Sequence, residues 1–559
     1  MLIQFKAKLH SLIQESLAEA FPSPKDFPSI EIETPAEKIH GEFSTNIALK
    51  SAKILKQSPL QVAEEFVANI KEALASSELK DKIEKIEIKN PGFINFFLSR
   101  EALYDTLSYI LKEKQRFGTS TIGKGKKIQI EFVSANPTGP LSVAHARQAA
   151  VGDALGNILA FLSFAVTKEY YINDRGNQIK LLGESVRIRI EEILTKEDRS
   201  AQLGEGHYKG EYLKSVAKAY LDQFPVSSAK QLKSQDPQIT QFTVDHILAI
   251  IRKELDDFGV RFDVWSSETK IATKDNIEAI LDYLGEKGFL YEKDGALWFK
   301  STDFGDDKDR VLEKSDGTHT YLTPDIVYHK KKLERGFSKI INIWGPDHHG
   351  YIPRLKAAVE ALGYDREILE VLIVQLATIY RDGKPVSMST RQGQFISLQE
   401  VMEEVGVDAA RFFFLMRHIE AHLEFDLELA KKQTPENPVY YIQYAYARIN
   451  SIYDKADIDG YKPKDKGFKL LKETEELDLI KKAGNFPQVL IVCYNQLDPY
   501  TLGSYLLELA ICFHKFYDKH RVLEENRDLA SERLALISAV KIIFENGLRL
   551  LGVSTPKKM

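Results

Sequence analysis

Two polar segments of this sequence, about 240 residues apart, contain the residue types that bind a triphosphate. The first is PTGPLSVAHAR (137–147), in which Ser142 and His145 can donate hydrogen bonds to phosphate oxygens. The second is GKPVSMSTRQG (383–393), in which Lys384 and Arg391 can supply positive charge. Taken alone, the first pattern is more often a helix cap with a surface histidine, and the second a solvent-exposed turn. Their chemistry therefore depends on whether the fold brings them to one site.

The residues around the first segment predict a βαβ unit. A strand is expected over 128–133, a loop with two prolines and a glycine follows, and apolar residues then recur at helical spacing over 151–162. A second strand is expected over 165–173. This order requires a parallel sheet. The first segment then lies at the carboxyl end of a strand, where ligands bind, and at a helix start, where backbone N–H groups favour phosphate.

A second junction of the same kind is expected at 339–362, where the strand KIINIW, the loop GPDHHG and a helix follow one another. The adjacent His348 and His349 could suggest a metal pair. Neighbouring side chains point in different directions on most backbones, and no third ligand stands at helical spacing, so no metal site is predicted. Between the two junctions, residues 177–290 are expected to form a mostly helical insertion.

The rest of the chain predicts two further domains. The first hundred residues alternate between helical and strand patterns, and the pattern beyond about residue 400 is almost wholly helical. We therefore expect a multidomain α/β protein with a small α+β N-terminal domain (1–112), a parallel-sheet catalytic domain with a helical insertion (122–430) and an all-α C-terminal domain (431–559). A length of 559 residues fits three or four domains.

Composition excludes several classes of protein. Two cysteines exclude a disulfide scaffold and a four-cysteine zinc site, and they fit a reducing compartment. No run of about 18 apolar residues occurs, so neither a signal peptide nor a membrane span is expected. The net charge of -5 gives no bulk attraction to nucleic acid, so an RNA partner must be bound by a local basic surface.

The two polar segments, in this order, resemble the two signatures of class I aminoacyl-tRNA synthetases, His-Ile-Gly-His and Lys-Met-Ser-Lys-Ser. Other segments narrow the resemblance to arginyl-tRNA synthetases of the bacterial type. They are HGEFSTNIA, PGFINF, EFVSANPTGP, EYYINDRGNQ, DGTHTYLTPDIVYH, WGPDHHGY, VDAARFFF, NPVYYIQYAYARI and the ending LLGV. These segments span nearly the entire chain in family order.

The resemblance implies an N-terminal tRNA-contacting domain, a Rossmann-type catalytic domain and a helical anticodon-binding domain. It implies ATP-dependent ligation of arginine to tRNA through arginyl-adenylate, with ATP as a substrate, Mg²⁺ as a cofactor and release of AMP and diphosphate. We expect tRNA and arginine as partners, no DNA, no membrane, a cytoplasmic location and a monomer. Most of the aromatic run 440–446 is expected in the core, with one or two tyrosines on anticodon bases.

The resemblance also carries family positions onto this sequence. A guanidinium presents five donors in a planar fork, which suits carboxylates and carbonyls. The positions for arginine fall on Glu131, Asn136, Tyr321, Asp325 and Asp347. Those for ATP fall on Pro137, Gly139, Ser142, His145, Arg147 and Met388. The catalytic set is Ser142, His145, Lys384, Met388, Ser389 and Arg391.

Both signatures depart from the family pattern. Ser142 and Ala144 replace a histidine and a glycine in the first, and Ser387 and Thr390 replace the two lysines of the second. Lost lysines remove charge that stabilises the transition state of adenylate formation. A catalytically silent paralogue that only binds tRNA is therefore the alternative, and a class I synthetase for another amino acid is a third interpretation. The intact amino-acid positions favour an active enzyme for arginine.

Overall fold

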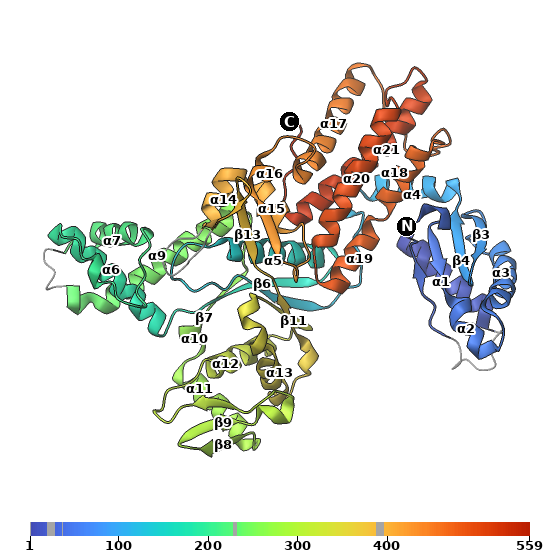
Figure 1. The fold of residues 1–559 in the computed structure, drawn as a ribbon. Coiled ribbons are helices and arrows are strands. Elements are labelled where there is room, and N and C mark those ends of the chain that lie inside the picture. The colour runs from blue at the N-terminus through green and yellow to red at the C-terminus, as the bar shows by residue number, and fades with distance from the viewer. Residues whose placement is uncertain (1, 19–27, 36, 227–231, 387–395) are drawn as a thin grey trace.

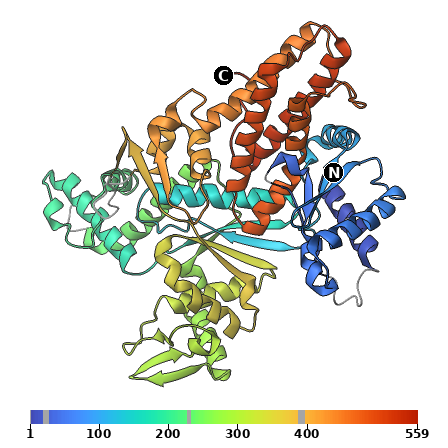
Figure 2. The same cartoon turned by 45° about the vertical axis from the view of Figure 1, so that its right-hand side comes forward.

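The computed structural model describes residues 2–18, 28–35, 37–226, 232–386 and 396–559 (Figure 1). A parallel sheet lies at the centre, and four groups of elements surround it. The helical C-terminal bundle and the N-terminal domain lie on one side of the sheet, and two separate insertions extend from the other sides (Figures 1 and 2). None of the helices in the described ranges is long and apolar enough to cross a bilayer.

The central sheet has five parallel strands in the order β12-β11-β5-β6-β7. The strands are β5 (Lys127–Glu131), β6 (Ala165–Ile172), β7 (Val264–Ser267), β11 (Lys339–Trp344) and β12 (Leu369–Ile373). The helices that follow or cover them are α5 (Val143–Phe161), α12 (Leu322–Leu333) and α13 (Ile352–Ala361). Because β5 and β11 are neighbours and run in parallel, their two carboxyl ends meet at one edge. The Rossmann-type prediction is confirmed.

The insertion is divided in two, because the chain returns to the central sheet at β7. Its first part contains α6 (Asn177–Thr195), α7 (Tyr212–Gln223) and α9 (Asp236–Asp257). Its second part contains α10 (Glu268–Ile271), α11 (Lys274–Glu286), β8 (Leu290–Lys293), β9 (Ala296–Phe299) and β10 (Arg310–Glu313). The elements in the described part of 177–290 are helices apart from β7, as the sequence predicts for most of it; β8, β9 and β10 begin at the end of that range or beyond it, and strands of four residues are too short for their periodicity to mark them.

Two smaller groups complete the catalytic region. The first is a three-stranded sheet of β13 (Ala377–Arg381), β14 (Lys384–Pro385) and β15 (Leu423–Asp426). The second is a group of short helices, α14 (Leu398–Val405), α15 (Val407–Phe414) and α16 (Leu427–Lys431). Arg411 of α15 is fully buried and donates to the carbonyls of Phe258 and Leu551, so it joins the insertion to the last helix of the chain.

The N-terminal domain is a four-stranded antiparallel sheet in the order β1-β2-β4-β3, covered by helices. Its elements are α1 (Leu2–Leu17), β1 (Ile32–Glu33), β2 (Phe43–Thr45), α2 (Ile47–Leu55), α3 (Pro59–Ala75), β3 (Ile83–Lys89) and β4 (Phe93–Leu98). The helix α4 (Arg100–Glu113) then packs against the C-terminal bundle, and Tyr104 donates to the carbonyl of Leu471 at 2.8 Å.

The C-terminal domain is all-α, as the sequence predicts. It consists of α17 (Pro438–Ile458), α18 (Thr474–Gly484), α19 (Phe486–Gln496), α20 (Tyr500–Lys519) and α21 (Arg527–Leu551). The start of α17 is fixed locally: the Asn437 side chain accepts from two backbone N–H groups, and Pro438 takes the first helical position. The helix α21 packs against α5, which brings this domain to the catalytic sheet.

Candidate functional site

The loop after β5 leads directly into α5. The chain leaves the strand through Val133 and Ser134, whose φ angles of 66° and 39° lie in the left-handed region. A β-branched residue rarely adopts this conformation, and such strain is concentrated where backbone positions functional groups. Ser134 Oγ fixes the turn, because it donates to Glu131 Oε1 at 3.0 Å and accepts the Tyr171 N–H at 3.1 Å. The loop ends at Ser142, the N-cap residue of α5.

His145 lies in the first turn of α5 and is bonded to that N-cap. The Ser142 N–H donates to His145 Nδ1 at 3.2 Å, and Ser142 Oγ lies 3.2 Å from the same nitrogen. Burial lowers the pKa of His145 to about 4, although the Asp347 carboxylate raises it. The ring is therefore neutral near pH 7. Because Nδ1 accepts a hydrogen bond, the ring proton lies on Nε2, which leaves a neutral N–H donor at a helix start.

The chain that follows the second segment pairs with the loop of the first. Ser142 and Ser397 form a β-bridge, and the Leu398 N–H donates to the Leu141 carbonyl at 2.8 Å. On the other side, the second segment begins at β14, where Lys384 is exposed. The fold therefore brings the chain that leaves the second segment to the loop of the first. The predicted residues Met388, Ser389 and Arg391 lie outside the described residues.

The loop after β11 lies beside the same helix. A Cβ at Gly345 would lie 2.7 Å from Asp347 Oδ1 and 3.6 Å from Nε2 of Gln148, which belongs to α5. Asp347 is close enough to raise the pKa of His145, and its own side chain is 79% exposed. The two βα junctions therefore form one site, with an accessible carboxylate next to a neutral imidazole.

Three carboxylates lie close together beside this site: Glu131 on β5, Glu268 on α10 and Asp325 on α12. Burial raises the pKa of Asp325 to about 7; the Tyr351 hydroxyl, which donates to it at 2.5 Å, opposes the shift, and the charges of Glu268 and Glu131 add to it. Burial also raises the pKa of Glu268. Tyr171 lies among the three carboxylates. Burial raises the pKa of its hydroxyl, and the negative charge of the carboxylates raises it further. The pocket therefore concentrates negative charge and favours a cationic ligand.

The three carboxylates differ in how they are neutralised. Glu131 forms an ion pair with Lys332, which is fully buried and also donates to Asn342 Oδ1 at 2.9 Å. Among the described residues, no cation forms an ion pair with Asp325. Glu268 has a long contact of 3.8 Å with Arg175. Asp325 is thus the group that gains most from a bound cation.

Comparison with known proteins identifies the domains of this chain. Three family models match in sequence: the arginyl tRNA synthetase N terminal domain over residues 7–98, the catalytic domain of tRNA synthetases class I (R) over 106–417, and the DALR anticodon binding domain over 442–559. The chain belongs to the arginyl-tRNA synthetase family.

Individual relatives agree over full length. An arginine–tRNA ligase of Bacillus subtilis is 44% identical over 560 residues, covering 100% of this chain and 99% of the relative. One of Geobacter sp. is 45% identical over 562 residues, with 100% of both chains covered. The structure of a Campylobacter jejuni protein described as a putative arginyl-tRNA synthetase is 37% identical, with a TM-score of 0.76 over 83% of this chain and 100% of that one. The fold also matches Thermus thermophilus arginyl-tRNA synthetase, at 21% identity and a TM-score of 0.76 over 99% of this chain and 100% of that one.

The remaining site residues of this synthetase lie in different surroundings. Tyr321 stands at the start of α12 and is 77% exposed, so its side chain is accessible to a ligand, and Tyr351 is the tyrosine bonded to Asp325. Asn136 donates to Gln178 Oε1 on α6 at 2.8 Å. Pro137 is buried and Gly139 partly buried in the loop before α5.

Arg147 has partners that the sequence did not predict. Its guanidinium is inside the fold and donates to four carbonyl oxygens, at distances of 2.6 to 3.3 Å. These carbonyls belong to Gln375, Leu376, His418 and Ala421. Because its donors are used in this way, Arg147 joins α5 to the segments around β13 and β15 rather than facing a ligand, and we omit it from the ATP site.

Sequence reasoning missed several members of the acidic pocket. Glu268 directly follows the short strand VWSS, and Tyr351 ends the loop GPDHHGY, which was interpreted for its histidines. Glu268 follows a strand of the central sheet directly and Tyr351 follows the loop after one, and those positions were the available signal. Lys332 carried no signal, because a lysine in the last turn of a helix usually lies in solvent.

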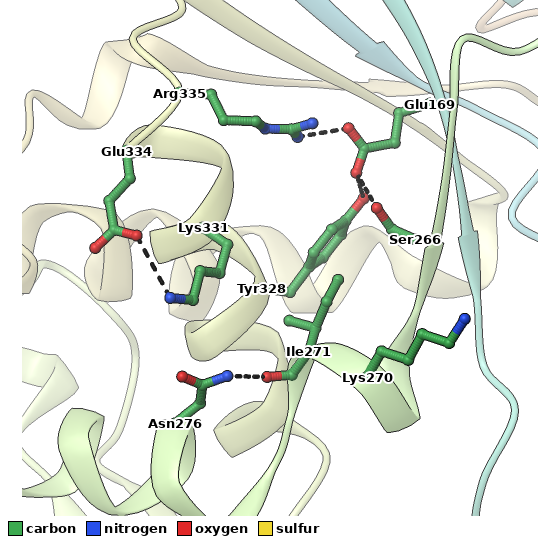
Figure 3. Close-up of a pocket in the computed structure, with 9 residues that line it drawn as sticks. All are labelled: Glu169, Ser266, Lys270, Ile271, Asn276, Tyr328, Lys331, Glu334 and Arg335. Carbon is green, nitrogen blue, oxygen red and sulfur yellow. Dashed lines mark hydrogen bonds and ion pairs between the residues drawn. The ribbon is translucent and has the colours of Figure 1, made fainter.

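A cavity of about 430 Å³ lies between α12 and the end of β7 (Figure 3). Glu169 is fully buried there and accepts from Ser266 at 2.7 Å, from Tyr328 at 2.9 Å and from Arg335. Tyr328 also stacks on Tyr171, with ring centroids 4.3 Å apart. This network anchors the helix that carries Asp325.

A second cavity, of about 690 Å³, lies between α17 and α20 in the anticodon-binding domain. Its lining includes Arg448, Lys455, Lys519, Arg521 and Tyr517. The Arg448 guanidinium lies 4.9 Å from the ring centroids of both Tyr444 and Tyr517. Of the tyrosines in the aromatic run, Tyr446 is buried, whereas Tyr440, Tyr441 and Tyr444 are half-buried, so less of the run lies in the core than the sequence predicted. Nowhere in the described ranges are three or more His, Cys, Asp or Glu side chains arranged to hold a metal ion.

Proposed function

We propose that this chain ligates arginine to tRNA in two steps, through arginyl-adenylate. The observation that carries the proposal is the pocket of Glu131, Glu268 and Asp325, directly beside the loop of Ser142 and His145. The pocket supplies unbalanced negative charge for the guanidinium of arginine. The start of α5, which suits the phosphates of ATP, lies next to it.

In this proposal Asp325 and Glu268 receive the guanidinium. A planar fork of donors can satisfy two carboxylates at once, and Asp325 gains the cation that it lacks in the free enzyme. Glu131, already neutralised by Lys332, shapes the pocket and orders the turn at Ser134. Asn136 and Tyr321 then serve the polar groups of the amino acid. Lysine is rejected because it leaves buried acceptors unpaired, so no editing domain is needed.

ATP lies over the start of α5 in this proposal. His145 Nε2–H and Ser142 contact its phosphates, and Pro137 and Gly139 shape the loop beneath it. The second segment closes on the pyrophosphate side through Lys384, Met388, Ser389 and Arg391, whose two cations replace the lysines that the family pattern has. Mg²⁺ binds mainly through phosphates and water, and the exposed carboxylate of Asp347 fits it as a protein ligand. It would neutralise phosphate charge.

The chemistry needs positioning more than proton transfer. A carboxylate oxygen of arginine attacks the α-phosphorus, and pyrophosphate leaves. A terminal ribose hydroxyl of tRNA then attacks the carbonyl carbon of arginyl-adenylate, and AMP leaves. The chain contributes aligned donors and fixed geometry. We assign no general base.

We assign tRNA binding to the C-terminal and N-terminal domains. The cavity lined by Arg448 and Tyr517 combines cations with aromatic faces, which suits the phosphates and bases of a single-stranded loop. A monomer in the cytoplasm that binds neither DNA nor membrane completes the proposal. The domain limits 1–112, 122–430 and 431–559 remain predictions.

The experiment is ATP–pyrophosphate exchange with arginine, with and without tRNA. We expect exchange that depends on arginine, and we expect tRNA to be needed or strongly stimulating. The silent paralogue is less favoured because the chain is 44% identical over its full length to an arginine–tRNA ligase. Tight tRNA binding with no exchange under any condition would establish that alternative.

A further inference from the structure

The helical part of the insertion contacts the loop before α5 at two backbone groups. On α9, Glu254 Oε2 accepts the backbone N–H of Leu141 at 3.0 Å. On α7, the Tyr212 hydroxyl donates to the carbonyl of Thr138. In both views, the first part of the insertion extends away from the sheet, and α9 runs back toward α5 (Figures 1 and 2). The insertion thus reaches the ATP loop from outside the catalytic sheet.

Glu254 is an unusual residue for this place. It is 5% exposed, and among the described residues no cation forms an ion pair with it. Burial raises its pKa, and the Leu141 hydrogen bond only partly opposes the effect. Burying an unpaired carboxylate costs stability, so an apolar residue would suit the fold better. What the carboxylate does provide is a fixed acceptor for one N–H of the ATP loop.

That N–H belongs to a peptide segment held from both sides. Leu141 is fully buried; its N–H bonds to Glu254, and its carbonyl accepts the Leu398 N–H at 2.8 Å. Leu398 follows the second signature segment. One residue, directly before the N-cap Ser142, therefore joins the insertion, the first signature and the chain leaving the second.

Tyr212 acts on the same loop three residues earlier. A Cβ at Gly139 would lie 3.0 Å from the Tyr212 ring, so a glycine lets the ring approach the backbone closely. Gly139 is thus required by packing against α7. The Tyr212 ring and hydroxyl together hold the backbone of Thr138 and Gly139 against α7.

We infer that Glu254 and Tyr212 are positioning residues for adenylate formation, and that the helical insertion sets the position of the ATP loop through them. They act through the backbone of Leu141 and Thr138, and touch no substrate. The inference rests on the proposed role of residues 137–145 in ATP binding. It assigns the first part of the insertion a task in the activation step, in addition to any contact with tRNA.

The test is steady-state ATP–pyrophosphate exchange with tRNA and arginine present. Displacing a reacting group by about 1 Å can cost about 100-fold in rate. Glu254→Ala should therefore raise the KM for ATP and lower kcat, by about 10- to 100-fold in kcat/KM, with arginine affinity by calorimetry unchanged within twofold. Glu254→Gln keeps an acceptor for the N–H and should restore activity to within about threefold. Tyr212→Phe, which keeps the ring, should cost about two- to tenfold in kcat/KM for ATP.

Glu191→Ala is the matched control. Glu191 is a buried carboxylate of the same insertion, but its side chain pairs with Arg187 and Arg199 inside it. An equal loss in Glu191→Ala and Glu254→Ala would show general loosening of the insertion and overturn the inference. A Glu254→Gln variant as poor as Glu254→Ala would also overturn the inference. The inference would fail as well if Glu254→Ala and Tyr212→Phe both used ATP as well as wild type. His145→Ala separates the two proposals: if it leaves ATP use unchanged, the ATP site itself is wrong.

Discussion

The pKa of Asp325 makes arginine binding depend on pH in a calculable way. In the free enzyme the pKa is raised to about 7 by burial and by two neighbouring carboxylates. The carboxyl is therefore neutral below about pH 7 and ionised above it. A guanidinium stays charged throughout this range and binds the ionised form, so affinity for arginine should rise as pH rises through about 7.

The size of the effect follows from proton linkage. The dissociation constant is multiplied by the factor 1 + 10^(pKa − pH), which is about 11 at pH 6 and about 1.1 at pH 8 for a pKa of about 7. Arginine should thus bind roughly tenfold more weakly at pH 6 than at pH 8, a difference of about 1.4 kcal/mol. Binding at pH 6 should also release about 0.9 proton per site, and binding at pH 8 about 0.1.

Calorimetry measures both quantities. Arginine is titrated into the enzyme at pH 6, 7 and 8, in buffers of different ionisation enthalpy, which yields the number of protons released. Asp325→Asn is the control, because it keeps the shape of the pocket but cannot titrate. The pKa of His145, lowered to about 4, lies below this range. A wild-type affinity that is flat from pH 6 to 8, with no proton release at pH 6, would refute the assignment of Asp325 to the guanidinium.

Three further outcomes are expected. His145→Ala should lower the single-turnover rate of arginyl-adenylate formation by about 100-fold, because it removes a donor aimed at developing phosphate charge. Ser142→Ala removes one neutral hydrogen bond and should lower the same rate by about tenfold or less. Equal effects of the two substitutions would contradict the assigned roles. Arg448→Ala should weaken tRNA binding and flatten its salt dependence while arginine affinity by calorimetry is unchanged; an unaltered tRNA affinity would move the contact elsewhere. Lys332→Met leaves Glu131 buried without its cation and should lower the free energy of unfolding by about 3–5 kcal/mol, measured as a large drop in Tm. A Tm equal to that of wild type would show that the ion pair contributes nothing to stability.

The sequence by itself determined the architecture and the position in it of the loop to which we assign ATP. The strand before Pro137, the helix after Ser142 and the matching junction at 339–362 are local patterns, and a parallel sheet follows from them because only a crossover helix can join neighbouring parallel strands. The all-α C-terminal domain followed from helical periodicity over more than a hundred residues. Such signals are local, so they survive without knowledge of packing.

The tertiary structure decided which side chains share a pocket and what state they are in. Glu131 and Asp325 were both predicted as ligands for arginine, but Lys332, 201 residues from Glu131 in sequence, pairs with Glu131, whereas burial raises the pKa of Asp325 to about 7. Arg147 looked like a phosphate ligand and is instead bonded to four carbonyls from two later segments. Glu254 gave no signal at all, because its acceptor role exists only once α9 packs beside Leu141. Ionisation and hydrogen bonding depend on desolvation and on partners far along the chain, and these arise only when the chain is folded.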